Sequence, residues 1–363
     1  MAKYSLPQPI PLPNPYSLFR GFNFIRPIRI ENSGAALKDY QVKITLTQDN
    51  FPFEKCRPDG ADIRFRADSG EIAPYWIESW SSNQATIWCK VPYVPEDSST
   101  LLWMVYGNPT AESQSSISQT FIREINGNQP VEGSWHIDEG YGEYVSDSSG
   151  NDNTGTIINA GWTNGRFGRA LSFDGSTAFV NIGNPSSLNQ PFSQLSVAAW
   201  VKFNSFTDSN ENIVVSKDND PNGRSWDIGA FGSSHAAFMC VFTSDGYACA
   251  DSGTALTTDV WYFLVGIYDG SNVKIYVNSE LKDTDNLTGT VNTNSVDILF
   301  ARRAASGIES WVHGIIDEVL IISKALSPEE IHDLYNYYGY TTTSYPGRVL
   351  IRKYTYPGPT IIL

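Results

Sequence analysis

The chain has 363 residues, of which 41% are hydrophobic and 18% are charged, and this composition predicts folded domains rather than disorder. Its formal net charge of −14 argues against nucleic acid and anionic membrane surfaces as partners, because both would be repelled. The opening MAKYSLPQPIPLPNPY has no apolar stretch of signal-peptide length, and no run of about 18 apolar residues predicts membrane insertion.

Residues 1–20 form a proline-rich segment in which every second residue from Pro7 to Pro15 is proline. Proline fixes φ and removes a backbone donor, so we predict an extended arm outside any central strand. An ordered arm of this kind needs a surface to lie against. The expectation is a contact with a neighbouring copy or with another coat or surface subunit.

Residues 21–110 show short stretches of alternating apolar and polar residues separated by turn residues, which predict a β-sandwich. The series DYQVKITL, DGADIRFRADSGEIAPYWIESW, ATIWCKVPYVP and LLWMVYGNP resembles the domain of unknown function DUF2341. That domain is common in archaeal, bacterial and viral surface proteins, so the resemblance implies an architecture rather than an activity. Residues 111–130 begin with a polar, serine-rich stretch that predicts a linker.

Residues 131–340 are predicted to form a second all-β domain. The stretches FDG, AAWVK, IYDGSNVKIYVN and IDEVLIISKALSPEEI, in this order, resemble the laminin-G-like, concanavalin A-like jelly roll. The predicted fold class is therefore all-β, with two tandem β-sandwiches, one short C-terminal helix and extended terminal arms.

The one predicted helix starts at Ser327 as N-cap, with Pro328 in the first turn and Glu330 completing a capping box, and Gly339 is expected to end it. Residues 341–363 form a tail with a strand predicted over 348–354. Its apolar end TIIL is expected to be buried, either on the first domain or on a neighbouring subunit.

Cys240 and Cys249 flank VFTSDGYA, which predicts a hairpin turning at Ser244–Gly246. Opposed positions of a hairpin bring two sulfurs within bonding distance, so a Cys240–Cys249 disulfide is predicted. The alternative is a pair of buried free thiols.

The loop DSSGNDNTGT, from Asp147 to Thr156, is rich in oxygen donors of the kind that Ca²⁺ prefers. It fails as an EF-hand because the glycine falls at position 4 and isoleucine occupies position 12. It resembles instead the first turn of laminin-G-like domains, where an Asp of the late IDEV strand often joins the turn around one Ca²⁺. The resemblance implies Asp147, Asn153 and Asp317 as ligands of a structural ion. The alternative is a turn whose side chains bond their own backbone.

Catalytic residues are not evident in the sequence. Asp317 and Glu318 are adjacent in a predicted strand and should point to opposite faces, so they should not form the carboxylate pair of a glycosidase. The four histidines lie in no triad or zinc spacing, and no phosphate-binding motif occurs. The prediction is therefore a protein that is not an enzyme, with a glycoside hydrolase as a lesser alternative.

Exposed aromatic rings can stack on sugars, and most aromatic residues in such a chain are expected to be core. Among the rings placed in predicted loops, Trp226 and Trp311 are selected as ligand-binding residues. The adjacent loop DNDPNGR, residues 218–224, could frame their site.

These observations predict a structural protein of a virion or cell surface. The specific hypothesis is a spike, turret or fibre component of an archaeal virus that assembles through residues 1–20 and 341–363 and recognises a glycan with its outer jelly roll. The alternative is a cellular adhesin or carbohydrate-binding module.

Overall fold

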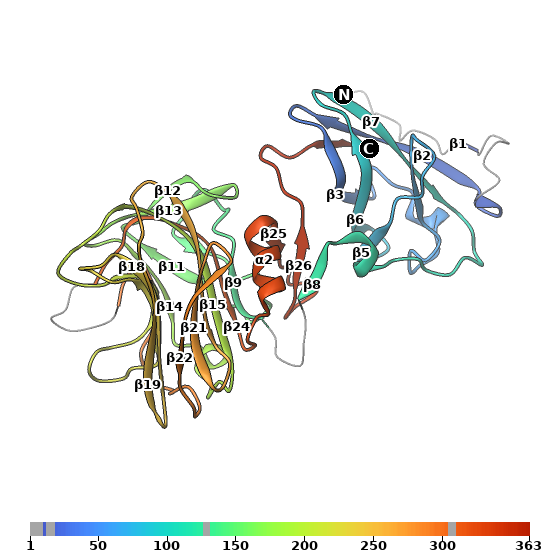
Figure 1. The fold of residues 1–363 in the computed structure, drawn as a ribbon. Helices are drawn as coiled ribbons and strands as arrows, with labels where there is room; N and C mark the ends of the chain where they lie inside the picture. Colours follow the sequence, from blue (N-terminus) through green and yellow to red (C-terminus); the bar gives the residue numbers. More distant parts are fainter. Residues whose placement is uncertain (1–9, 12–18, 126–130, 304–309) are drawn as a thin grey trace. The chain divides into compact units, whose positions relative to one another are not determined.

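The computed structural model describes residues 10–11, 19–125, 131–303 and 310–363, and the chain forms two compact all-β units (Figure 1). The first unit comprises the chain up to Glu124 and again Leu350–Leu363, and the second comprises Ile125–Val349. The chain passes from one unit to the other within strand β8 (Arg123–Ile125) and returns within strand β26 (Val349–Arg352). Neither helix in the described ranges is long and apolar enough to cross a membrane.

The first unit is a sandwich of two antiparallel sheets. In one sheet the order is β1 (Ile10–Pro11), β2 (Phe24–Asn32), β7 (Ser98–Tyr106) and β4 (Arg64–Ala67), and β27 (Thr360–Ile362) also pairs with β2. The other sheet contains β3 (Leu37–Thr47), β6 (Gln84–Val94) and β5 (Tyr75–Trp80). Alternate residues of both sheets meet in one core that includes the fully buried Ile28, Ile44 and Phe65. The predicted sandwich is confirmed.

The C-terminal tail joins this first sandwich. Ile361 of β27 pairs with Ile30 of β2, and both Ile361 and Leu363 pack against the core of the unit. Of the predicted proline-rich arm, residues 10–11 pair with β2 at the same strand edge, and residues 1–9 and 12–18 lie outside the described residues. The apolar end of the tail thus has an intramolecular partner, and assembly through either segment stays a prediction.

The segment predicted as a linker is largely structured. Ser116 donates its backbone N–H to Tyr75 O and caps helix α1 (Ile117–Thr120), and the side chain of Gln41 donates to Thr120 O at 3.0 Å. Phe121 is buried against Trp76. Residues 111–124 therefore belong to the first sandwich. The serine-rich composition did not indicate this, because it does not reveal that Ser115 Oγ accepts the backbone N–H of Ile77 in β5 at 2.8 Å. Residues 126–130 lie outside the described residues.

The second unit is a jelly roll of two antiparallel sheets. The first, called here the β10–β19 sheet, has the order β10 (Tyr144–Val145), β11 (Gly155–Ile158), β14 (Phe179–Gly183), β23 (Ile298–Phe300), β16 (Asn212–Lys217), β17 (Trp226–Ala230), β18 (Ala236–Thr243) and β19 (Gly246–Ala255). The second, the β12–β22 sheet, has the order β12 (Gly161–Asn164), β13 (Arg169–Asp174), β24 (His313–Ile322), β15 (Leu195–Ser205), β20 (Trp261–Tyr268), β21 (Asn272–Val277) and β22 (Glu280–Asn286), and β9 (Val131–Trp135) pairs with β24. Their inner faces enclose one large apolar core.

Helix α2 (Pro328–Asn336) follows β24 directly (Figure 1). Ser327 and Glu330 form the predicted capping box, with both reciprocal hydrogen bonds present. The predicted stop at Gly339 is wrong. The helix ends at Asn336 because Tyr337 is already extended, and Gly339 lies inside β25 (Tyr338–Tyr340).

Candidate functional site

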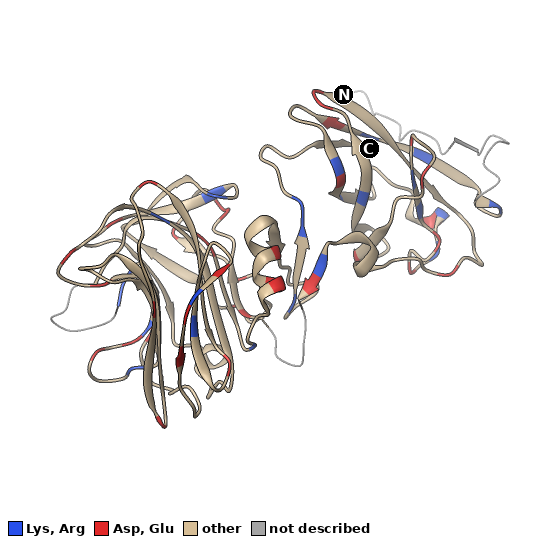
Figure 2. Ribbon diagram, in the orientation of Figure 1, with Lys and Arg blue, Asp and Glu red and all other residues tan. Residues whose placement is uncertain are grey.

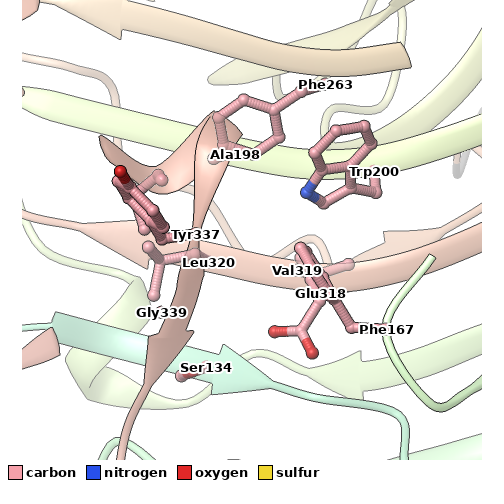
Figure 3. Close-up of a pocket in the computed structure, with 11 residues that line it drawn as sticks. Ser134, Phe167, Ala198, Trp200, Phe263, Glu318, Val319, Leu320, Tyr337 and Gly339 are labelled. Carbon is pink, nitrogen blue, oxygen red and sulfur yellow. The ribbon is translucent and has the colours of Figure 1, made fainter. Parts of the chain in front are cut away.

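Helix α2 covers the outer face of the β12–β22 sheet. Tyr335 of the helix stacks on Trp200 of β15 with centroids 5.6 Å apart and ring planes 16° apart, and Phe263 of β20 lies 5.1 Å from Trp200. Figure 3 shows the pocket that remains here, with Trp200, Phe263 and Glu318 in its wall. Its volume of about 20 Å³ has room for about one water molecule. The pocket under helix α2 is therefore too small for a saccharide.

Strand β24 contains a β-bulge at Glu318, which has a φ of +53°. A bulge inserts one extra residue and interrupts the alternation of side chains. Ile316 and Val319 both belong to the core as a result, and Asp317 and Glu318 lie between them on the outer side. The prediction that Asp317 and Glu318 point to opposite faces is wrong for this reason.

The two carboxyl groups nevertheless serve separate internal contacts. Glu318 Oε2 lies 2.8 Å from His136 Nδ1, and His136 Nε2 lies 2.8 Å from Thr341 Oγ1. Asp317 is fully buried and accepts a hydrogen bond from the backbone N–H of Phe167 at 2.9 Å. Burial first, and then the charge of Glu318, raise the pKa of Asp317 well above its usual value. No part of Asp317 reaches solvent, so the pair offers no catalytic site.

The predicted calcium ligand Asp147 is the centre of a hydrogen-bonded turn. Its Oδ1 accepts the backbone N–H groups of Ser134 and Ser149 at 2.9 and 2.8 Å. Its Oδ2 accepts the hydroxyl of Ser149 at 2.7 Å and the backbone N–H of Asn153 at 3.0 Å. The side-chain amide of Asn153 donates to Glu132 O at 2.8 Å. Each oxygen of Asp147 therefore already accepts two hydrogen bonds.

These residues do not fit a calcium ion. The cation needs oxygen lone pairs, and at Asp147 donors already occupy them. Asp317 has a different neighbourhood, at Phe167, and shares no hydrogen-bond partner with Asp147. Within the described ranges, no group of three or more His, Cys, Asp or Glu side chains could hold a metal. The geometry supports the alternative, a turn that bonds its own backbone.

The outer face of the β10–β19 sheet has a different character. Trp226, Ile228 and Met239 of β17 and β18 belong to the core. Residues that alternate with them, among them Asp227 and Cys240, therefore point to the outer face. This face carries charged side chains over its centre and aromatic rings on both sides.

The charged side chains form what we call the ionic cluster, made of Asp218, Asp227, Arg224, Arg303 and Glu211. Arg224 donates hydrogen bonds to the Asp218 carboxylate, from Nε to Oδ1 at 3.1 Å and from Nη2 to Oδ2 at 2.7 Å. Arg303 contacts Asp227 at 3.3 Å and Glu211 at 3.0 Å. Asp218, Asp227 and Arg303 are 0%, 1% and 3% exposed, so the centre of the cluster is closed to solvent.

Asp227 is the titratable group at the centre of this cluster. Burial, followed by the negative charge of Asp218, raises the pKa of Asp227 to about 8, although Arg303 and Arg224 act in the opposite direction. The folded protein therefore favours the protonated form of this carboxyl group more than water does. One buried proton thus relieves the repulsion between the two carboxylates.

An aromatic platform borders the ionic cluster on β18 and β19. The rings of Phe242 and Tyr247 stack with centroids 5.3 Å apart, and the guanidinium of Arg224 lies 4.1 Å from the centroid of Phe242. Tyr247 is 69% exposed. Cys240 and Cys249, opposed in the same two strands, form a disulfide with an S–S distance of 2.04 Å. The disulfide and the Phe242 ring anchor Tyr247 on a rigid hairpin.

The two tryptophans selected from the sequence differ in their burial. Trp226 is fully buried in the core of the sandwich, so its selection as a ligand-binding residue is corrected: it lies in a strand, not in a loop. Trp311 is half-buried on the other side of the ionic cluster. The guanidinium of Arg302 lies 4.5 Å from its centroid, and Phe179 lies 6.1 Å from it. The role of Trp311 in ligand binding stays a prediction.

Sequence reasoning missed the ionic cluster, apart from the expectation that the loop 218–224 frames a site. Asp227 interrupts an otherwise apolar strand, WDIGA, and that interruption was the available signal. Its partner Arg303 lies 76 residues away in the chain, and no local pattern links the two. Tyr247 was recognisable only as a ring beside a predicted turn.

Comparisons with known families agree with this architecture. Residues 174–332 match the concanavalin A-like lectin/glucanases superfamily, and residues 59–138 match the domain of unknown function DUF2341. A comparison with curated proteins found no match.

Solved structures similar to this chain include domain 4 of AbnA, a GH43 extracellular arabinanase from Geobacillus stearothermophilus, in complex with arabinotriose. It is 20% identical, with a TM-score of 0.47, and the match covers 58% of this chain and 100% of that one. The binding domain of Paraclostridial Mosquitocidal Protein 1 is 15% identical, with coverage of 57% and 52% and a TM-score of 0.47. The binding domain of botulinum neurotoxin serotype G is 15% identical, with coverage of 56% and 50% and a TM-score of 0.46. The chain thus spans about half the length of these two toxin domains, and nothing about ligands follows from likenesses of this size.

Proposed function

Because the chain joins a DUF2341 domain to a laminin-G-like, concanavalin A-like jelly roll, we propose that it is a non-catalytic surface protein whose jelly roll binds a saccharide. The superfamily is named for lectins and glucanases, and this supports a role in binding carbohydrate. The observation that carries the proposal is the aromatic platform, where the exposed Tyr247 stacks on Phe242 beside Arg224. The exposed ring can stack on a sugar, and the neighbouring guanidinium can donate hydrogen bonds to the hydroxyl groups of that sugar.

Binding fits this face better than hydrolysis does. A glycosidase needs two carboxyl groups that reach the scissile bond. Here Asp218 and Asp227 are closed to solvent, and both are held by arginines. We therefore assign the ionic cluster to support of the platform, since it fixes the position of Arg224.

The proposal is tested with the full chain on an array of glycans, followed by titration of the best ligand. We expect Tyr247→Ala to weaken binding about ten-fold, the loss of about 1.4 kcal/mol, because it removes the exposed stacking surface. The matched control is Tyr144→Ala, which removes a ring that is 58% exposed on β10. Equal affinity of Tyr247→Ala and the unchanged protein, or no binding to any glycan, would contradict the proposal.

The finer hypothesis, a virion spike, turret or fibre component of an archaeal virus, also remains a proposal. Its support is the all-β, acidic and aromatic-rich chain with a proline-rich segment at its N-terminal end. A cellular adhesin would use the same platform, so electron microscopy of the native assembly is the measurement that separates the two.

A further inference from the structure

A second groove lies in the first sandwich, between β3 and the C-terminal residues 352–361. Its volume is about 270 Å³. The lining residues are Tyr40, Gln41, Val42, Lys43, Trp88, Arg352, Tyr354, Thr355, Gly358, Pro359 and Ile361. Two of these side chains are cationic, and none is a carboxylate. Such a lining is unusual in a chain with a net charge of −14.

Aromatic rings hold the two cations in place. Lys43 Nζ lies 5.7 Å from the centroid of Trp88, and the guanidinium of Arg352 lies 5.1 Å from the same ring and 5.3 Å from that of Tyr354. The Trp88 indole is fixed in turn, because its N–H donates to Glu78 Oε2 at 2.8 Å. Both positive charges are therefore oriented before any ligand arrives.

The wall made by the C-terminal segment is also built into the fold. The backbone N–H of Lys353 donates to Gln41 Oε1 at 3.0 Å, and its Nζ donates to Lys38 O at 2.5 Å. The backbone N–H of Thr355 donates to the hydroxyl of Tyr40 at 3.2 Å. Lys38 and Lys353 thereby add positive charge beside the groove.

We infer that this groove, here called the basic groove, binds an acidic saccharide that carries carboxylate or sulfate groups. Lys43 and Arg352 would pair with the anionic groups, and the half-buried ring of Tyr354 borders the space where a sugar ring would lie, with the buried Trp88 behind the two cations. The volume is near the lower end of ligand pockets, which suits one or two sugar rings better than a folded partner. Nucleic acid fits less well, because a long polyanion would extend from the few cations onto an acidic surface.

The test uses the full chain and isothermal titration with three oligosaccharides of equal length: oligogalacturonate, sulfated dextran fragments and neutral dextran fragments. We expect at least one acidic probe to bind, neutral dextran not to bind, and added salt to weaken the interaction. Binding of the carboxylated or of the sulfated probe identifies the anionic group. Equal binding of neutral dextran, or no binding of either acidic probe, would overturn the inference, and so would tighter binding of a single-stranded oligonucleotide of equal charge.

The variant Lys43→Gln/Arg352→Gln should bind at least ten-fold more weakly. Its matched control is Lys202→Gln, because Lys202 also lies 5.7 Å from a tryptophan ring, that of Trp261, on the jelly roll. If the double variant unfolds, Lys38→Gln/Lys43→Gln replaces the exposed Lys43 of the groove and the exposed Lys38 beside it and should also weaken binding. Equal losses in Lys202→Gln would overturn the assignment. Tyr247→Ala should leave this binding unchanged, so failure here and failure of the jelly-roll proposal are distinguishable.

Discussion

Asp227 shows how strongly one residue can depend on its surroundings. Its carboxyl group is fully buried beside Asp218, and only Arg303 and Arg224 offset the cost of ionising it. The folded protein therefore holds the proton of Asp227 up to a pH of about 8, whereas an unfolded chain releases it near pH 4.

This difference predicts how stability depends on pH. Between about pH 4 and pH 8 the folded state binds more protons at Asp227 than the unfolded state does, so its contribution falls as pH rises. Urea unfolding of the full chain at pH 5 and at pH 8 should show this loss. Asp227→Asn, which cannot ionise, should flatten the profile, and Asp49→Asn at an exposed site should not. If the free energy of unfolding of Asp227→Asn depends on pH as steeply as that of the unchanged protein, the Asp227 carboxyl group does not cause the dependence.

Single rings also have roles that depend on the strand that carries them. Trp226 and Tyr247 both stand close to predicted loops in the sequence, yet one is fully buried and the other is 69% exposed. Trp226 belongs to the inner face of β17, whereas Tyr247 pairs with Phe242 on the outer face of the β18–β19 hairpin. Side-chain alternation within each strand therefore decides which ring can meet a ligand.

At the scale of elements, the turn from β10 to β11 depends on Asp147. The turn needs Gly150, whose φ is +98°, because an added Cβ would lie 2.5 Å from the Cβ of Pro346. The carboxylate then joins β9 to the turn through Ser134 and Asn153. The loop is thus a structural joint of the jelly roll, and no ion is needed to explain its sequence.

We expect Asp147→Ala to lower the free energy of unfolding by about 2–4 kcal/mol, because it leaves several buried N–H groups without an acceptor. The measurement is urea unfolding, with Asp152→Asn as the control in the same loop, at an exposed position whose φ of +60° asparagine tolerates. Excess Ca²⁺ or a chelator should leave the midpoint of the unchanged protein where it is. A Ca²⁺-dependent midpoint that is lost in Asp147→Ala would restore the calcium hypothesis.

The bulge in β24 shows how one inserted residue redirects an element. With regular alternation Asp317 and Glu318 would separate, whereas the bulge places both on the outer side, near helix α2. Glu318 then contacts His136, which also contacts Thr341, so the strand is joined to the chain that follows β25. The departure from the regular strand thereby creates a polar connection.

At the scale of the molecule, the first unit contains both the N-terminal part of the chain and its last residues, Leu350–Leu363. The first sandwich contains the C-terminal strand β27, so it is complete only after the whole jelly roll has been synthesised. Acidic and basic residues are dispersed along the ribbons of both units (Figure 2). The basic groove depends on the return of the C-terminal segment to the first unit, because residues of this segment form one of its walls.

The proline-rich arm is the segment of the first unit that we propose for subunit contacts. Deleting residues 1–20 should abolish assembly and leave a folded monomer, because the main core of the sandwich starts beyond the arm, at residues such as Ile28, and the deletion removes Phe19 from the smaller cluster with Ile25 and Val105. Sedimentation and circular dichroism of the truncated and full chains measure the two properties. Assembly that survives the deletion would assign the contacts to another surface.

The sequence alone determined the features that depend on neighbours along the chain. Alternation of period two predicted the strands of the first sandwich, the resemblance to laminin-G-like domains predicted the second sandwich, and the capping box at Ser327 predicted where helix α2 begins. The hairpin around Ser244–Gly246 predicted which cysteines face each other, because their spacing in the chain fixes their opposition.

Only the tertiary structure decided the features that join distant residues. It placed Arg303 on Asp227, Lys353 on Gln41 and the C-terminal strand on β2. It also overrode local patterns where packing required it, with a bulge at Glu318 and a structured segment in place of a linker. The physical reason is the same in each case: burial and charge pairing act between residues that only the completed fold brings into contact.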